Sequence, residues 1–467
     1  MYSVAAPKKS SVHSPSLGLG LIALSLVSAC GSEPVVPPTP PTPTELVFVI
    51  TLDTLRADHL GTYGYVRDTS PHMDAFAEES LLFENAITTM STTLPAHVSL
   101  FTGTHTIHHG VESNFNMSMN GFESRTDLQS MAEVFQRGGY QTAAFVSTVP
   151  LKAHTGIQVG FDEFFEPDEA KKQYFLSAKV INKKVFDWLE TRPEGPTFVW
   201  IHYSDPHSPY IPPKGFDTFG EEPVVNELIA TRMGMEPDQA VKDLYDAYDG
   251  EVRYLDHELG RLFAEIRKRG MYDDALITIV GDHGEGLEQH GWIAHGHIYD
   301  EQLLVPLMIK FPAGNPHNGT RYASAMSIID IPNIMDGGAV LPYTDEDRRL
   351  WQGFDVLNDA DRHGVFSARV IRADRDQLFE SGRRFSLTED RWKYFYLTEH
   401  DDELFDRLND PHELSNVIDE HPDVANRMKA EIAEMLEHFW NQSNDEGEGP
   451  PLPEDVIKGL SDLGYTD

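Results

Sequence analysis

The chain has 467 residues, with 75 acidic and 37 basic side chains, a net charge of −38 at pH 7 and 40% apolar residues. Its length predicts two or three domains, and its ordinary apolar content excludes a wholly disordered chain. Because so negative a surface repels nucleic acids and anionic lipid headgroups, we exclude a nucleic-acid-binding function.

Residues 1–29 predict a signal peptide. A short basic segment precedes a mostly apolar run over residues 17–27, eleven residues where a membrane-spanning helix needs about 20. The only cysteine, Cys30, follows at the expected cleavage position, in a stretch that resembles the lipobox of bacterial lipoproteins. The resemblance implies a lipid anchor on Cys30 in the cell envelope, at the outer membrane because Gly31 follows, with no other contact to a membrane. A plain secretory signal with an incidental cysteine is the alternative.

The Pro-rich stretch over residues 30–44 predicts an extended linker with little to bury. A single cysteine leaves no possibility of an intrachain disulfide or of a Cys-rich zinc cluster.

The body of the chain predicts an α/β fold. Three continuous apolar runs, residues 46–51, 197–201 and 275–280, are typical of central strands buried on both faces of a parallel sheet. Between them, residues 127–138 and 238–269 have helical spacing. This alternation predicts a doubly wound, mostly parallel sheet flanked by helices, in a catalytic domain over residues 45–345.

Polar side chains follow each of these strands. Asp53 comes after the first, His202 and the segment around His207 after the second, and Asp282 with His283 after the third. Ligands of such sheets bind beyond the carboxyl ends of the strands, so we expect these side chains to lie at one edge.

A smaller C-terminal α+β domain is predicted over residues 346–442. It has strand-like stretches at 385–387 and 392–396 and an amphipathic helix over 422–439. Residues 443–467 begin as a low-complexity stretch rich in Asp, Glu, Gly and Pro, which indicates an acidic linker and tail.

Several ordered motifs within residues 46–467 resemble the sulfatase family of the alkaline-phosphatase-like superfamily. They are Asp53–Leu60 with Tyr63–Tyr65, Thr93–Gly103, Val280–Glu285, and the tail segment Arg391–Tyr394. The resemblance implies hydrolysis of a sulfate or phosphate ester. Such chemistry needs an activated oxygen nucleophile, a Lewis acid on the ester oxygens and a proton donor for the leaving group.

The resemblance also assigns site residues. Thr93 stands at the first position of the C/S-x-P-x-R motif, where the family has its nucleophile, and His97 stands at the position of the Arg. The family's metal ligands correspond to Asp53, Asp282, His283 and Thr93, which implies a divalent ion: Ca²⁺, Mn²⁺ or Zn²⁺, with one site better supported than two. The resemblance also implies that His207 and His295 contact the ester oxygens or the leaving group. It implies that Asn114 contacts the substrate.

The sequence departs from sulfatases proper in ways that bear on the substrate. Thr93 cannot be oxidised to formylglycine because its Cβ carries a methyl group, so its hydroxyl must attack directly. The lost formylglycine route and the replaced motif Arg disfavour a sulfate ester, and the further missing cationic positions disfavour a doubly charged phosphate monoester, so we expect a singly charged phosphate or phosphonate ester. The sequence leaves open whether the alcohol part of the ester substrate is a small molecule, a glycan or a lipid. A phospho-group transferase and a catalytically inactive surface lipoprotein are the alternatives.

Overall fold

The computed structural model describes residues 43–114, 128–168, 175–219, 239–353, 356, 364–371, 382–397 and 401–444. These residues belong to one compact unit that begins at Thr42. The predicted signal peptide, Cys30, the linker up to residue 42 and the tail from residue 445 lie outside the described residues. No helix in the described ranges is long and apolar enough to cross a membrane.

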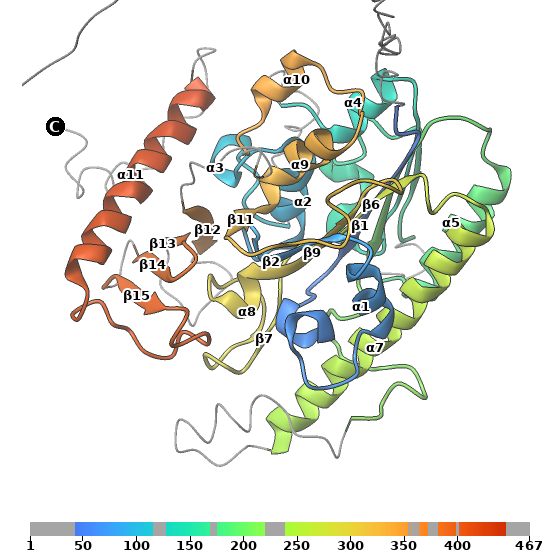
Figure 1. Cartoon of the computed structure of the whole chain (residues 1–467). Helices are drawn as coiled ribbons and strands as arrows, with labels where there is room; N and C mark the ends of the chain where they lie inside the picture. The colour runs from blue at the N-terminus through green and yellow to red at the C-terminus, as the bar shows by residue number, and fades with distance from the viewer. Residues whose placement is uncertain are drawn as a thin grey trace, which may run out of the picture. The chain divides into compact units, whose positions relative to one another are not determined.

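A nine-stranded sheet forms the centre of the unit (Figure 1). Its order is β10-β2-β9-β6-β1-β5-β3-β4, with β11 also paired to β2. Only β9 runs antiparallel to its neighbours, β2 and β6. In chain order the strands are β1 (Leu46–Leu52), β2 (Leu81–Ile87), β3 (Gln141–Phe145), β4 (Glu163–Phe165), β5 (Thr197–Tyr203), β6 (Ala275–Gly281), β9 (Leu304–Lys310), β10 (Arg321–Tyr322) and β11 (Met326–Ser327).

Helices cover both faces of this sheet. Along β1, Val47 and Val49 point into the core beneath α2, α4 and α9, whereas Phe48 and Ile50 point into the core beneath α1, α5 and α7. Burial on both faces explains why the strand sequence is continuously apolar rather than alternating. The helices are α1 (Pro71–Ala77), α2 (Thr93–Thr102), α3 (Thr106–His109), α4 (Met131–Arg137), α5 (Ala178–Thr191), α7 (Gln239–Lys268), α8 (Asp300–Leu303), α9 (Ile331–Gly338), α10 (Asp345–Leu350) and α11 (Pro422–Asn444).

A second, antiparallel sheet of four strands follows toward the C-terminus. It packs against α11 in a core of its own that includes Met428 and Ile432. Two bonds attach it to the chain between β2 and α2, from Ala368 N–H to Thr89 O and from the Ser367 hydroxyl to Thr88 O. Its strands are β12 (Val365–Ile371), β13 (Gly382–Thr388), β14 (Trp392–Leu397) and β15 (Glu403–Asp406), and a small hairpin, β7 (Gly286–Leu287) with β8 (Ile293–Ala294), follows β6.

A buried ionic network also joins the second sheet to α8. The Lys393 ammonium lies 2.7 Å from Asp300 and 2.9 Å from Glu413, and Arg407 lies 2.7 Å from Asp300. Lys393 is completely buried. Its positive charge compensates the carboxylates of Asp300 and Glu413, and Arg407 also compensates Asp300. The network fixes the chain just after residues 295–299, which carry a predicted site histidine.

The predicted fold class is confirmed: a mostly parallel sheet flanked by helices, with an antiparallel C-terminal sheet. The three predicted strands correspond to β1, β5 and β6, and the long predicted helix is α7. The boundary predicted near residue 345 stays a prediction.

Candidate active site

Three neighbouring strands bring the predicted ligands together. β1 lies between β5 and β6 in parallel register, with Leu52 opposite both Tyr203 and Gly281. The backbone continues this pairing one residue beyond the strands, because Asp53 N–H donates to Tyr203 O and Asp282 N–H donates to Leu52 O. The two carboxylates therefore emerge side by side at the carboxyl edge of the sheet, as the strand-end pattern predicted.

Thr54, directly after Asp53, has a backbone conformation that is rare for a β-branched residue. Its φ is +58°, in the left-handed region. The turn directs the Thr54 N–H to Asp282 Oδ1 at 3.2 Å and its hydroxyl to Asp53 O at 2.7 Å. Strain of this kind is held where surrounding contacts over-determine the chain, and here it places the Thr54 N–H on the Asp282 carboxylate.

Asp53, Asp282 and His283 place their ligand atoms within 4.8 Å of one another, and all three are buried. His283 Nε2 lies 3.7 Å from Asp53 Oδ1, 3.5 Å from Asp282 Oδ2 and 3.3 Å from Thr93 Oγ1. Two atoms that each lie about 2.1 Å from one ion are about 3.4 Å apart at the tetrahedral angle. These four groups therefore have the spacing of ligands around a single ion.

The protonation states of His283 and of the Asp53 and Asp282 carboxylates also suit a bound cation. His283 Nδ1–H donates to Gly284 O at 2.9 Å, which leaves a lone pair on Nε2 facing the carboxylates. Burial raises the pKa of Asp53 to about 6, and burial together with repulsion from Asp53 raises the pKa of Asp282 well above its usual range. Both Asp53 oxygens and Asp282 Oδ2 have no hydrogen-bond partner among the described residues. Two buried, unpaired carboxylates are costly unless a cation compensates them.

Thr93 is the first residue of α2, and its side chain is buried at this cluster. The helix ends at Gly103, whose φ of +61° lies in the left-handed region that favours glycine. Asn114 Oδ1 accepts a hydrogen bond from Leu94 N–H at 2.8 Å, so it holds the residue after Thr93. The predicted substrate contact of Asn114 stays a prediction.

His97 lies behind Thr93, one helical turn along. Its Nδ1–H donates to Thr93 O at 2.7 Å, and its Nε2 bonds to the Thr51 hydroxyl at 2.9 Å. Trp200 Nε1–H donates to the same hydroxyl. Burial lowers the pKa of His97 to about 4, so the imidazole is neutral at pH 7. His97, to which the resemblance gives the position of the motif Arg, thus carries no positive charge at pH 7, and it holds the start of α2.

His207 and His295 lie close to His283 and to each other. The His295 ring centroid is 4.3 Å from that of His283 and 5.6 Å from that of His207. His295 Nδ1–H donates to Ser91 O at 3.0 Å, and His207 Nδ1–H donates to Ser208 O at 2.7 Å. Each imidazole is thereby fixed with Nε2 left to act on a ligand. Burial lowers the pKa of His295 to about 4.

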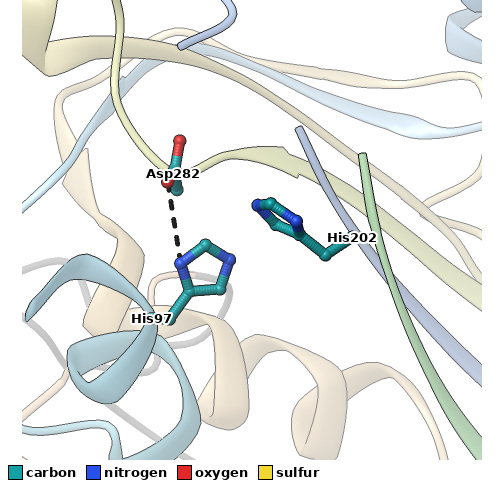
Figure 2. A group of neighbouring side chains, drawn as sticks. All are labelled: His97, His202 and Asp282. Carbon is teal, nitrogen blue, oxygen red and sulfur yellow. Dashed lines mark ion pairs between the residues drawn. The ribbon is translucent and has the colours of Figure 1, made fainter. Parts of the chain in front are cut away.

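His202 is one of the strand-end candidate ligands, and the resemblance to sulfatases assigns it no role. Figure 2 shows that its ring faces the same cluster as His97 and Asp282, and these three also have ligand atoms within 4.8 Å of one another. His202 Nε2 lies 3.7 Å from Asp53 Oδ2. The signal that could have found it is its position at the end of a strand adjacent to β1.

Comparison with known proteins bears on the family and the fold of the chain. Residues 45–336 match the family model described as "Sulfatase". The chain is 23% identical to an arylsulfatase of Clostridium perfringens, over 87% of this chain and 98% of that protein. It is 22% identical to an N-acetylglucosamine-6-O-sulfatase of Bacteroides thetaiotaomicron, over 91% of each chain. The fold resembles the phosphonate monoester hydrolase of Agrobacterium radiobacter with a TM-score of 0.67 and 20% identity, over 86% of this chain and 96% of that one.

Proposed function

This chain belongs to the sulfatase family, a family of ester hydrolases, and we propose that it hydrolyses a singly charged phosphate or phosphonate ester with Thr93 as the nucleophile. The observation that carries the proposal is the convergence of Thr93 Oγ1 with His283 Nε2, Asp53 and Asp282 at distances that suit one divalent ion.

Asp53, Asp282, His283 and Thr93 would hold that ion. A set of two carboxylates, one imidazole and one hydroxyl favours Mn²⁺, Zn²⁺ or Fe²⁺ over Ca²⁺, which prefers an all-oxygen site. Bound there, the ion would supply Lewis acidity to the ester and lower the pKa of the Thr93 hydroxyl.

The chain's own residues account for the remaining steps. Thr93 Oγ1 attacks the phosphorus, and its orientation follows from the hydrogen bonds that His97 and Asn114 make at the first turn of α2. His207 and His295 present Nε2 to the ester, since Nδ1 of each is bound to a backbone carbonyl. His207 protonates the leaving alcohol and later takes the proton from the water that releases Thr93, whereas burial keeps His295 neutral with its one ring proton on Nδ1.

Charge supports a singly charged ester over a doubly charged phosphate monoester. All ion pairs of Asp53 and Asp282 within the described residues go to histidines, and none goes to Lys or Arg. A doubly charged monoester would therefore meet two carboxylates with little positive charge from side chains. A singly charged diester or phosphonate monoester meets less repulsion.

Four nitrophenyl substrates test the proposal: a phosphate monoester, a phosphate diester, a phosphonate monoester and a sulfate ester. Each is assayed with the full chain in Mn²⁺, Zn²⁺ or Ca²⁺, beside Thr93→Ala and Thr93→Ser. We expect the diester or the phosphonate to be turned over fastest, Thr93→Ala to be inactive and Thr93→Ser to retain turnover. Fastest turnover of the sulfate would contradict the proposed specificity, and turnover by Thr93→Ala would contradict the proposed nucleophile.

We also propose that the protein is anchored to the bacterial outer membrane through lipid on Cys30, a role based on the sequence around this residue. Membrane fractionation of Cys30→Ser tests it. The variant should move to the soluble fraction, and continued membrane retention would contradict lipid anchoring.

A further inference from the structure

The β7–β8 hairpin ends directly before His295, and its backbone is strained. Glu288 has a φ of +75°, and Ala294, the residue before His295, has a φ of +86°. Both angles lie in the left-handed region, which residues other than glycine rarely adopt. Such a conformation persists only where surrounding contacts hold it. The placement of His295 therefore depends on the contacts that hold the hairpin.

His290, in the turn between β7 and β8, bonds to two other segments of the chain. Its Nδ1 lies 2.9 Å from Glu301 Oε1 in α8, and its Nε2 lies 3.2 Å from Glu413 O, which follows β15. The ring also stacks on Tyr299, with 3.6 Å between the ring centroids and 6° between the ring planes. His290 thus connects the turn of the hairpin to α8 and to the segment after β15.

The two hydrogen bonds together require a doubly protonated ring. A carboxylate and a peptide carbonyl can only accept, so Nδ1 and Nε2 of His290 must both donate. A neutral imidazole has one N–H and can make only one of the two bonds. The pKa points the same way. Partial burial opposes the charge on the ring, but the Glu301 carboxylate and the Glu413 carbonyl outweigh it and raise the pKa of His290 above its usual value of 6.5.

The other titratable groups that face His290 come from three segments of the described chain. They are Glu301 from α8, Glu413 from the segment after β15, and His297 and Tyr299 from the segment before α8. Burial and two nearby arginines lower the pKa of His297 to about 3, and burial raises the pKa of Tyr299, so both are neutral near pH 7. Burial raises the pKa of Glu413 while Lys393 lowers it, so an experiment must separate its titration from that of His290.

We propose that protonated His290 is a positioning residue for the ester hydrolysis, because it holds the β7–β8 hairpin in the conformation that places His295 in the site. The inference rests on the proposed function for the role of His295 at the ester. When the ring of His290 loses a proton, one of its two bonds breaks and the strained hairpin is held less firmly. We expect kcat to fall about tenfold, as for the loss of one charge-assisted hydrogen bond.

The ratio of kcat between the wild type and His290→Gln tests this role, because groups that titrate in both proteins cancel in the ratio. The full chain is assayed with a nitrophenyl phosphonate in Mn²⁺ between pH 6 and 9. We expect a ratio of about 10 at pH 6 that falls toward 1 at pH 9. His154→Gln, at an exposed histidine, is the matched control and should follow the wild type. Glu413→Gln keeps the carbonyl, removes the titrating side chain and should keep the step in the pH profile. A ratio that does not change with pH, or a step that disappears in Glu413→Gln, would overturn the role of His290.

Hydrogen–deuterium exchange reads the hairpin itself and needs neither substrate nor variant. Protection of the amides in residues 286–296, corrected for the intrinsic exchange rate at each pH, should fall in the wild type as the pH rises from 6 to 9. In His290→Gln, shown to be folded by thermal unfolding, it should be low throughout. Constant protection in the wild type with intact turnover would overturn the inference and leave the proposed function standing. Turnover of no ester, with protection that falls as expected, would overturn the proposed function and the role of His295 while confirming that protonated His290 holds the hairpin.

Discussion

The ion-free protein should become less stable as the pH rises, because Asp53 is then buried with a charge and no cation. Burial raises the pKa of this carboxyl from 3.8 to about 6. A difference of this size costs about 3 kcal/mol once the group is fully ionised in the folded state. Since the folded protein binds this proton more tightly than the unfolded chain, the stabilising effect of the bound proton is complete below pH 3.8. It is lost as the pH rises through about 6.

Asp53→Asn keeps the shape of the side chain and removes its charge, and with that charge it removes the repulsion that raises the pKa of Asp282. Urea unfolding of the full chain in EDTA is measured between pH 4 and 7.5 for the wild type and the variant. Relative to Asp53→Asn, the wild type should lose about 3 kcal/mol of unfolding free energy across this range. Added Mn²⁺ should restore the wild type and have little effect on the variant. A difference that does not change with pH, or a variant less stable than the wild type in EDTA at pH 7.5, would refute the reasoning.

Four further predictions concern single side chains. Thr93→Ala should abolish turnover while the protein still binds metal, as measured by metal content beside activity. His207→Gln should slow esters of weakly acidic alcohols by about 10²–10⁴-fold and nitrophenyl esters much less, because nitrophenol leaves without a proton donor. Lys393→Met should lower the unfolding free energy in urea by about 3–5 kcal/mol, since it leaves Asp300 and Glu413 under-compensated. Phe175, 47% exposed and with its ring 5.0 Å from His207, should contact an aromatic leaving group, so Phe175→Ala should raise the KM of aryl esters severalfold.

Each of these has a contradicting result. Loss of metal from Thr93→Ala would leave its inactivity uninformative about the nucleophile and would contradict a site held mainly by Asp53 and His283. An equal effect of His207→Gln on all leaving groups would contradict proton donation. An unfolding free energy unchanged in Lys393→Met would show that the ionic network contributes little. For Phe175→Ala, the matched control is Val66→Ala, which removes another exposed apolar side chain; equal KM values in both variants would contradict contact with the leaving group.

Much of the fold could be predicted because its central strands are buried on both faces. In β1, β5 and β6 that burial requires continuous apolar runs, and such runs are easily recognised in a single sequence. The antiparallel position of β9 could not be predicted, because Leu304–Lys310 is as continuously apolar as the parallel strands. The direction of a strand depends on the path of the chain that connects it to its neighbours. That path does not change the hydrophobic pattern of the strand's own sequence.

The site residues that follow the ends of strands could be predicted from the sequence. The roles of side chains that depend on their hydrogen bonds could not. Asp53, Asp282 and His283 follow strands, so topology alone brings them together. The neutral, doubly bonded state of His97 depends on Thr51 and on Thr93 O, and no spacing in the sequence indicates it. The sequence likewise gives no sign of which ring nitrogen of His202 faces Asp53, since this follows from contacts with Ser147 and Ser204.

The attack of Thr93 itself on the ester is the central step proposed for this protein. Rapid acid quenching of the metal-loaded full chain during turnover of a nitrophenyl phosphonate, followed by peptide mass spectrometry, tests it most directly. We expect a phosphonyl group on the Thr93 hydroxyl within the first turnover and its absence in Thr93→Ala. Turnover with no covalent intermediate, or with the group attached to another residue, would contradict the claim.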